Sequence, residues 1–474
     1  MTDSETVAHE KRRAHAKALM LAGVAAIGGF LFGFDTSIIN GAVSAIGKDF
    51  GIGSIALGFV VSSALLGCAV GAWFAGQLSN ALGRVRVMLI AAILFFISAI
   101  GSALAVAAWD LVIWRVIGGL AVGAASVIAP AYIAEISPAN MRGRLGSLQQ
   151  LAIVSGIFVA LLADFVFATA AGGANEPLWW GLDAWRWMFA SAAIPAFAYG
   201  IMALQIPESP RYLVSKHELT RAREVLKSVL GGNVDQRITE IERSLKSDKP
   251  PRMGDLKGPV LGLLPIVWVG ILLSVFQQFV GINVIFYYSS TLWEAVGFSQ
   301  SDSMLISVIT SVTNIVTTLV AIALVDKLGR KPLLLAGSAA MAVSLGVMAF
   351  IFATAPVADV AGKPQPMLGD LEGPIALVAA NLFVFGFGCS WGPLVWVLLG
   401  EMFGNRIRAS ALAVAAAAQW VANWTVSATF PWLSEVGLGL AYGLYAGMAA
   451  LSFVFVARAV RETKGRELED MDRA

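Results

Sequence analysis

The chain has 474 residues, of which 58% are hydrophobic and only 14% are charged. Charged residues make up about 25% of a typical soluble protein, so this composition excludes a soluble globular domain and indicates a protein that crosses a membrane many times. The net charge of +2 gives no indication of a nucleic-acid partner. Cys68 and Cys389 both lie in apolar stretches, so we expect neither a disulfide framework nor a metal cluster.

Apolar stretches divide the chain into twelve predicted transmembrane helices, at roughly 20 residues for each span. Residues 1–17 are polar and basic and resemble no cleavable signal. Six spans are expected near 18–45, 55–79, 86–108, 110–135, 145–170 and 186–206, and six more near 259–290, 302–325, 331–354, 374–400, 407–430 and 436–459. We therefore predict an all-α membrane protein with an N-terminal half (1–206), a linker (207–258) and a C-terminal half (259–474).

The linker carries charges of both signs throughout, which predicts short amphipathic helices on a solvated surface. Lys and Arg recur in alternate short loops, for example at Arg84, Arg142 and Arg406, on the same side as both termini and the linker. Basic loops face the cytoplasm in membrane proteins. We expect a multi-pass protein of the cell (inner) membrane with both termini in the cytoplasm.

The two halves repeat a pattern of charged residues at this cytoplasmic face. The repeated groups are Gly83-Arg84 with Gly329-Arg330, and Glu135 with Arg142, matched by Glu401 with Arg408 at the same seven-residue offset. These charges could serve orientation alone. The matched offsets favour a second interpretation, in which they form latches between helices that hold the cytoplasmic gate shut in the outward-facing state.

The seventh predicted span ends in a cluster of polar residues. An unpaired amide in an apolar medium costs roughly 2–7 kcal/mol, so Gln277, Gln278 and Asn283 need a polar environment. Asn283 and Tyr287 share a helical face, whereas Gln278 lies off it. A helix broken at Gly281 could turn these groups towards one cavity, as discontinuous helices do in transporters. Uncharged amide and phenol groups suit a neutral polyhydroxylated ligand.

Four motifs give the chain a resemblance to a known family over nearly its full length. They are Pro207-Glu208-Ser209-Pro210-Arg211-Tyr212-Leu213, Gln277-Gln278-Phe279-Val280-Gly281-Ile282-Asn283, Asp326-Lys327-Leu328-Gly329-Arg330-Lys331 and Glu462-Thr463-Lys464-Gly465-Arg466. With them the chain resembles the sugar porter branch of the major facilitator superfamily, close in pattern to bacterial xylose/glucose–proton symporters. Arg461, Asn80 and Val85 depart from the family pattern. The resemblance implies the major facilitator fold and transport of a monosaccharide by alternating access.

The resemblance also implies a sugar site drawn from both halves. The residues that match the family's sugar-binding amides are Gln150, Gln277, Gln278, Asn283, Asn314, Gln419 and Asn423, and Trp396 matches its sugar-stacking tryptophan. A flat ring face complements the C–H face of a pyranose. Hydrogen bonds between helices are the alternative role for one or two of the amides. Tyr287 and Trp420 are either sugar contacts or packing residues.

Proton coupling is expected at Asp35, a carboxylate inside the first span, with Arg115 in the fourth span as its partner. Small residues allow close helix approach, so stripes of glycine in the two helices, Gly29 with Gly33 and Gly119 with Gly123, make this pair sterically reasonable. Asp35 matches the proton-coupling aspartate of the family's bacterial symporters. A structural ion pair is the alternative. Glu135 and Asp164 lie nearer to span ends and are less expected to carry the proton.

The predicted function is secondary active transport of glucose or a related hexose or pentose with a proton. A facilitative uniporter is the alternative, a non-transporting sugar sensor is less expected, and the duplicated latch argues against a channel. Ile157, on the face of Gln150, is apolar where xylose-transporting relatives can carry an amide, which favours glucose. We expect no cofactor, metal or enzymatic activity. The expected partners are the sugar, the proton and the lipid bilayer, and the protein is expected to be a monomer.

Overall fold

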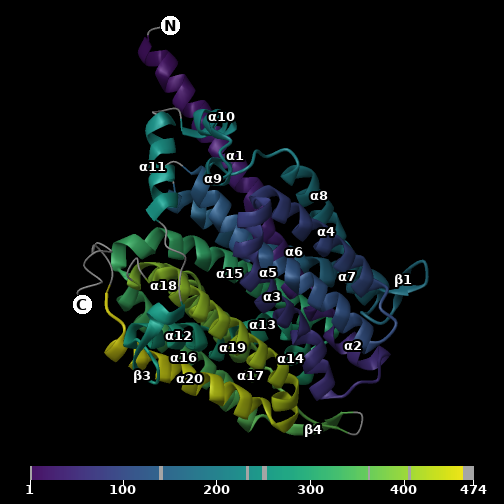
Figure 1. Ribbon diagram of the computed structural model, residues 1–474. Coiled ribbons are helices and arrows are strands. Elements are labelled where there is room, and N and C mark those ends of the chain that lie inside the picture. The colour runs from purple at the N-terminus through teal and green to yellow at the C-terminus, as the bar shows by residue number, and fades with distance from the viewer. Residues whose placement is uncertain are drawn as a thin grey trace.

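A computed structural model of the chain describes residues 3–137, 142–230, 234–247, 253–360, 363–403 and 407–462 (Figure 1). Long helices run side by side through the molecule. The helices of the linker lie at the end where the N-terminal helix projects, and two short β-hairpins lie at the opposite end. We call these the linker end and the hairpin end.

The first group of helices covers the chain up to residue 203. Its elements are α1 (Asp3–Ser37), the 3₁₀ helix η1 (Asn40–Ala42), α2 (Val43–Asp49), α3 (Ser54–Leu82), α4 (Arg84–Ala103), α5 (Ala108–Ile136), α6 (Arg142–Ala171), α7 (Ala184–Ser191) and α8 (Ala193–Ala203). Strands β1 (Pro177–Trp179) and β2 (Leu182–Asp183) pair antiparallel between α6 and α7.

The linker contains three helices, as its charge pattern predicts: α9 (Pro210–Ser215), α10 (Leu219–Leu230) and α11 (Val234–Ser247). Ser209 begins α9, because its hydroxyl accepts a hydrogen bond from the Tyr212 amide and Pro210 occupies the first turn, where a missing N–H costs nothing. The 3₁₀ helix η3 (Met253–Leu256) and strand β3 (Lys257–Val260) lead into the next helix.

The second group of helices follows the linker. Its elements are α12 (Pro265–Phe279), α13 (Ile282–Tyr287), α14 (Ser289–Ala295), α15 (Gln300–Leu328), α16 (Arg330–Thr354), β4 (Val357–Val360), β5 (Lys363–Pro366), α17 (Glu372–Gly388), α18 (Trp391–Met402), α19 (Arg408–Val436) and α20 (Leu438–Ala459). Strands β4 and β5 pair antiparallel. The first group meets the second where α3 packs against α19 and α6 packs against α15.

The predicted twelve-helix architecture is confirmed. Ten helical segments within the described residues are long and apolar enough to cross a membrane. The sixth predicted span and α19 complete the twelve. Four features differ from the predicted spans. Helix α1 begins at Asp3 rather than near residue 18, and α12 begins at Pro265 rather than near 259, because strand β3 occupies Lys257–Val260. The sixth span divides into α7 and α8 at Ala192, and the tenth divides into α17 and α18. Apolar composition identifies the part of α1 that can cross a membrane, and the helix continues beyond that part into polar sequence.

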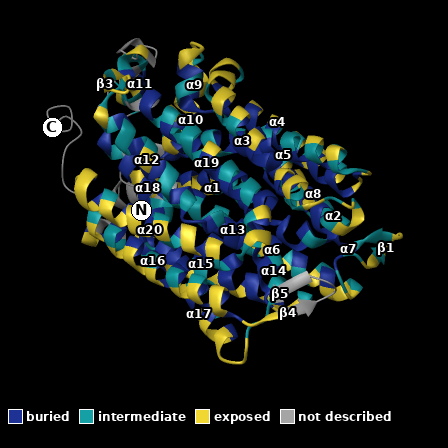
Figure 2. Cartoon of the chain, turned by 90° about the horizontal axis from the view of Figure 1, so that it is seen from below, coloured by how far each residue is buried: buried dark blue, intermediate teal, exposed yellow. Residues whose placement is uncertain are grey.

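Burial follows the pattern of a protein surrounded by lipid. Large apolar side chains such as Trp73, Phe74 and Phe350 are more than half exposed on the outer faces of their helices, whereas the interior is closely packed (Figure 2). Contiguous exposed apolar surface of this kind needs a non-aqueous partner. The exposed belt therefore fits the hydrocarbon layer of a membrane.

The glycine stripes support close helix contacts, but not the predicted one. A Cβ at Gly33 would overlap the Ile153 carbonyl of α6, and Cβ atoms at Gly119 and Gly123 would overlap backbone atoms of α3. The stripes thus bring α1 against α6 and α5 against α3, rather than α1 against α5. Four-residue spacing identifies a face for close packing, but it does not identify the neighbour.

Candidate functional site

The polar stretch of the seventh span lies at a break between two helices. Helix α12 ends at Phe279, and Gly281 begins α13 with a φ angle of 83° and ψ of 20°, in the left-handed region. Glycine adopts this conformation without the steric penalty that a Cβ brings. A Cβ at Gly281 would also lie 2.7 Å from Cδ2 of Tyr445 on α20. Both the backbone angle and the neighbouring ring therefore require glycine at this position.

The break brings three amide side chains into one hydrogen-bonded chain. Nδ2 of Asn283 donates to Oε1 of Gln278 at 2.6 Å, and Nε2 of Gln278 donates to Oε1 of Gln277 at 3.4 Å. Nε2 of Gln277 donates to the carbonyl oxygens of Trp391 at 2.9 Å and Gly392 at 3.2 Å, at the start of α18. The bond between Asn283 and Gln278 links α13 to α12, so the amides on both sides of the break act as one preorganised polar surface.

The remaining predicted sugar contacts lie on α6, α13, α15, α18 and α19. Asn314 and Asn423 are buried, and the Asn423 Oδ1 atom accepts a hydrogen bond from Ser427. Gln150 is half-buried, and Oε1 of the half-buried Gln419 is a buried atom without a hydrogen-bond partner. An unpaired buried acceptor is costly, so Gln419 is suited to a ligand that brings a donor.

The three aromatic residues occupy different environments. Tyr287 is buried and lies beside the side chains of Asn423 and Thr36, so it contacts both groups of helices. Trp420 packs against apolar clusters of both groups, with its ring 6.0 Å from that of Phe32. Trp396 is 43% exposed. An exposed ring face is available for stacking, whereas Tyr287 and Trp420 lie at the junction of the two groups.

Asp35 and Arg115 form an ion pair inside the first group. The guanidinium NH1 of Arg115 lies 3.3 Å from Oδ2 of Asp35 and also donates to the Asp35 carbonyl oxygen at 3.0 Å. Both side chains are more than nine-tenths buried, and the Arg115 guanidinium lies over the Phe189 ring. Its Nε has no partner. Charges buried together are costly to separate, so the pair is sensitive to any change in its hydration or charge.

The predicted gating residues form two similar ion pairs at the linker end, one between Arg84 and Glu135 and one between Arg330 and Glu401. We call each pair with its surroundings a corner. Arg84 makes two side-chain bonds to Glu135, of 2.9 and 2.8 Å, and Arg330 makes two to Glu401, of 3.1 and 2.8 Å. Each pair joins helices of one group, so these two pairs do not themselves connect the groups. The side chains of Arg142 and Arg408 lie outside the described residues.

Each corner contains a second glutamate to which the sequence analysis assigned no role. Glu208 accepts the backbone N–H groups of Arg84 and Val85, at 2.9 and 3.1 Å, and Glu462 accepts those of Arg330 and Lys331, at 3.0 and 2.9 Å. A carboxylate at a helix N-terminus satisfies free N–H groups and offsets the helix dipole. Both glutamates belong to motifs named above, and each follows the sixth span of its half, which was the signal that could have identified them.

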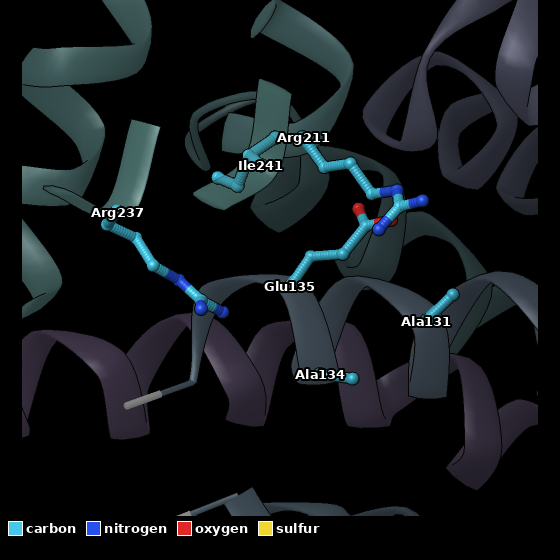
Figure 3. A pocket seen from close by; sticks show the side chains of 6 residues that line it. All are labelled: Ala131, Ala134, Glu135, Arg211, Arg237 and Ile241. Carbon is cyan, nitrogen blue, oxygen red and sulfur yellow. The ribbon is translucent and has the colours of Figure 1, made fainter. Parts of the chain in front are cut away.

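A cavity of about 360 Å³ lies beside the first corner, between α5 and the linker helices (Figure 3). Ala131, Ala134, Glu135, Arg211, Arg237 and Ile241 line it. The Arg211 guanidinium lies next to the Glu135 carboxylate (Figure 3). None of the predicted sugar contacts lines this cavity, so it belongs to the gate corner rather than to the sugar site.

Hydrogen bonds join the two groups at the hairpin end. Nδ2 of Asn40 donates to the Phe286 carbonyl oxygen at 2.8 Å, Ser290 N donates to Oδ1 of Asn40 at 3.2 Å, and Ser290 Oγ donates to the Asn40 carbonyl oxygen at 2.6 Å. We call these three bonds the Asn40 clasp. Nearby, Ser44 donates to Glu294 at 3.3 Å, and burial raises the pKa of Glu294. The hairpin end is thus closed by polar contacts between the groups.

Comparison with known proteins agrees with this arrangement. Residues 21–474 match the family model "Sugar (and other) transporter". The chain is 58% identical over 455 residues to a glucose transport protein of Synechocystis, covering 96% of each chain, and 38% identical over 484 residues to the D-xylose-proton symporter of Escherichia coli, covering 95% of this chain and 94% of the relative.

Solved structures show the same fold. The inward-open xylose transporter XylE of E. coli superposes with a TM-score of 0.80 at 36% identity, covering 96% of this chain and 99% of XylE. XylE bound to 6-bromo-6-deoxy-D-glucose gives a TM-score of 0.77 at 36% identity, covering 96% and 98%. With its helix order, its broken seventh span and these matches, the chain belongs to the sugar transporter family of the major facilitator superfamily.

Proposed function

We propose that the protein is a monosaccharide–proton symporter that works by alternating access. The observation that carries this proposal is a buried Asp35–Arg115 pair within the same bundle as a hydrogen-bonded chain of uncharged amides. An amide surface binds hydroxyl groups without requiring charge, and a buried carboxylate is the group that can take up a proton. A relative named as a proton symporter supports the coupling.

In this mechanism Asp35 carries the proton and Arg115 responds to it. With Asp35 ionised, the pair is neutral as a whole and keeps α1 and α5 together. Protonation removes the attraction and leaves the Arg115 charge without its counter-ion, so the two protonation states favour different arrangements of the helices. The side chain of Tyr287 lies beside Thr36, the next residue after Asp35, so α13 contacts α1 one residue away from the proton site.

The sugar is held by the amide surface of the seventh span and by residues of the facing helices. Gln277, Gln278 and Asn283 supply the continuous polar edge, and the role of sugar contact extends to Gln150, Tyr287, Asn314, Trp396, Gln419, Trp420 and Asn423. The half-buried, apolar Ile157 and the glucose transport protein at 58% identity both support glucose as the substrate.

The linker end is proposed to face the cytoplasm, because basic residues concentrate there. The closed hairpin end then corresponds to an inward-facing conformation. The corners at Arg84 and Arg330 brace the cytoplasmic ends of their helices, with Arg142 and Arg408 as further gate residues. We place the protein in the cell (inner) membrane as a monomer with both termini inside, divided at 1–206, 207–258 and 259–474, and we assign it no enzymatic activity.

The test uses Asp35→Asn in proteoliposomes with an imposed proton gradient. The wild type should accumulate labelled glucose against its gradient, and the variant should not, because asparagine keeps the size of aspartate but cannot titrate. Sugar binding measured by calorimetry should survive, and downhill exchange should persist. Uphill uptake by the variant at the wild-type rate would show that another group carries the proton. Absence of uphill uptake in both proteins, with facilitated exchange in both, would identify a uniporter.

A further inference from the structure

Asp164 on α6 is a buried carboxylate that the proposed mechanism does not use. Its side chain is 1% exposed. One oxygen, Oδ2, accepts the Gly41 backbone N–H at 2.8 Å, and the other, Oδ1, has no hydrogen-bond partner. An ionised carboxylate in such a position is costly unless a cation or several donors compensate it. A single N–H donor fits the neutral acid.

Towards the hairpin end, the charged groups of the helices packed against α6 are engaged elsewhere. On α1, Asp35 faces Arg115 of α5; on α7, Arg186 donates to the carbonyl oxygens of Ala103 and Ala105; and on α15, Asp302 pairs with Ser299. At the near end of α5, Asp110 accepts the N–H of Val106 and the Trp114 indole. Within the described residues, Asp164 thus has no cation partner on the elements packed against α6.

The position of Asp164 connects it to the closed hairpin end. Gly41 belongs to η1, the short turn after α1, and the preceding residue is Asn40 of the clasp. A Cβ at Gly41 would lie 2.7 Å from both Cβ and Cγ of Asp164, so the turn rests directly on this side chain. Asp164 holds one side of the turn, and the second group, through Phe286 and Ser290, holds the other. The turn that covers Asp164 is therefore the same turn that the clasp fastens to the second group.

We propose that Asp164 is a second proton-binding group of the transporter: it is neutral while the Asn40 clasp is closed, and it releases its proton to water at the hairpin end when the clasp opens. The proton leaves Oδ1 for water and returns from water before closure. Acid at the hairpin end therefore favours closure independently of Asp35. This inference rests on the proposed transport function, in which the hairpin end faces outward.

The experiment measures clasp opening directly by electron–electron distance measurements between two spin labels. Val106→Cys, before α5, and Leu371→Cys, before α17, place labels on exposed positions at the hairpin end of the two groups. Cys68→Ala and Cys389→Ala remove the other thiols. Without sugar, the wild type should shift from short to long distances as the pH rises, by up to about tenfold in population for each pH unit. Asp164→Asn, which cannot ionise, should remain closed throughout.

Three controls separate Asp164 from other carboxylates. Asp35→Asn should keep a pH-dependent shift in clasp opening, and so should Glu294→Gln, which removes the carboxylate bonded to Ser44 beside the clasp. Glu176→Gln, at an exposed carboxylate of the same end, should behave as the wild type. The proposal would be overturned if the distances in Asp164→Asn changed with pH as they do in the wild type. It would also be overturned if the pH dependence were lost in Asp35→Asn but kept in Asp164→Asn.

A second measurement needs no change at Asp164. We compare infrared spectra of acid and alkaline samples of a variant that carries both Asp35→Asn and Glu294→Gln. The difference spectrum should contain the carbonyl band of a buried protonated carboxyl group, which is lost at alkaline pH together with clasp closure. Absence of that band would contradict the proposal. Neither readout requires sugar or a proton gradient, so failure here is distinguishable from failure of the symport test at Asp35.

Discussion

Replacing Gly281 by alanine tests whether the helix break shapes the sugar site. At a φ of 83° a Cβ introduces strain of about 1–3 kcal/mol. The new Cβ would also lie 2.7 Å from the Tyr445 ring, which is buried against Tyr442 at a centroid distance of 5.9 Å. Overpacking of this kind costs about 1–3 kcal/mol. The two effects together amount to roughly 2–6 kcal/mol, unless α13 moves and relieves them.

Either outcome is measurable in purified protein. If α13 stays in place, the melting temperature falls; if it moves, Asn283 separates from Gln278 and glucose affinity falls by tenfold or more. Gly447→Ala on α20 is the matched control, because a Cβ there meets no atom within 4 Å. Adding Tyr445→Leu to Gly281→Ala should recover the stability or affinity lost through overlap with the ring. The loss that comes from backbone strain at position 281 should remain. A wild-type melting temperature together with wild-type affinity in Gly281→Ala would refute the reasoning.

Three further predictions concern the sugar site, the corner at Arg330 and the buried carboxylate Glu294. Gln278→Ala and Asn283→Ala should each weaken glucose binding by about 1–3 kcal/mol in calorimetry, and the double variant should lose less than the sum because the two amides share a bond; full additivity would argue against the chain. Arg330→Gln should lower stability by about 1–3 kcal/mol, because Glu401 loses both side-chain bonds from this arginine; an unchanged melting temperature would exclude this. Burial raises the pKa of Glu294, so the folded protein binds more protons than the unfolded chain at pH values between the ordinary and the raised pKa. The free energy of unfolding therefore falls as pH rises through that window. Glu294→Gln should flatten this slope when denaturation is measured against pH, and a slope that persists in the variant would place its origin at another group.

Sequence patterns were sufficient for features that depend on local composition. Apolar stretches predict the spans, mixed charge predicts the linker helices, and the polar residues around Gly281 indicate a broken helix where one is found. The Asp35–Arg115 pair could also be anticipated, since two opposite charges in apolar spans have few other ways to be compensated.

Contacts that depend on which helices are neighbours could not be predicted from sequence patterns. The glycine stripes identify close-packing faces, but the partners of Gly33 and Gly119 are set by the arrangement of the whole bundle. The bond between Gln278 and Asn283 crosses a turn whose angle a regular helix does not describe. The Asn40 clasp joins residues about 250 positions apart in the chain, in an apolar context where a lone asparagine gives little signal.

The two glutamate caps have a consequence for how the protein is made. Glu208 reaches Arg84 over 124 positions and precedes α12, so the first corner can be completed before the second six helices are synthesised. Glu462 reaches Arg330 over 132 positions and follows α20, so the second corner must wait until all twelve spans have been synthesised. Domains generally fold in the order of synthesis. The first six helices can therefore assemble with their corner closed while the second six are still being inserted. Truncation of the chain directly after α20 would remove Glu462 and leave only the second corner open.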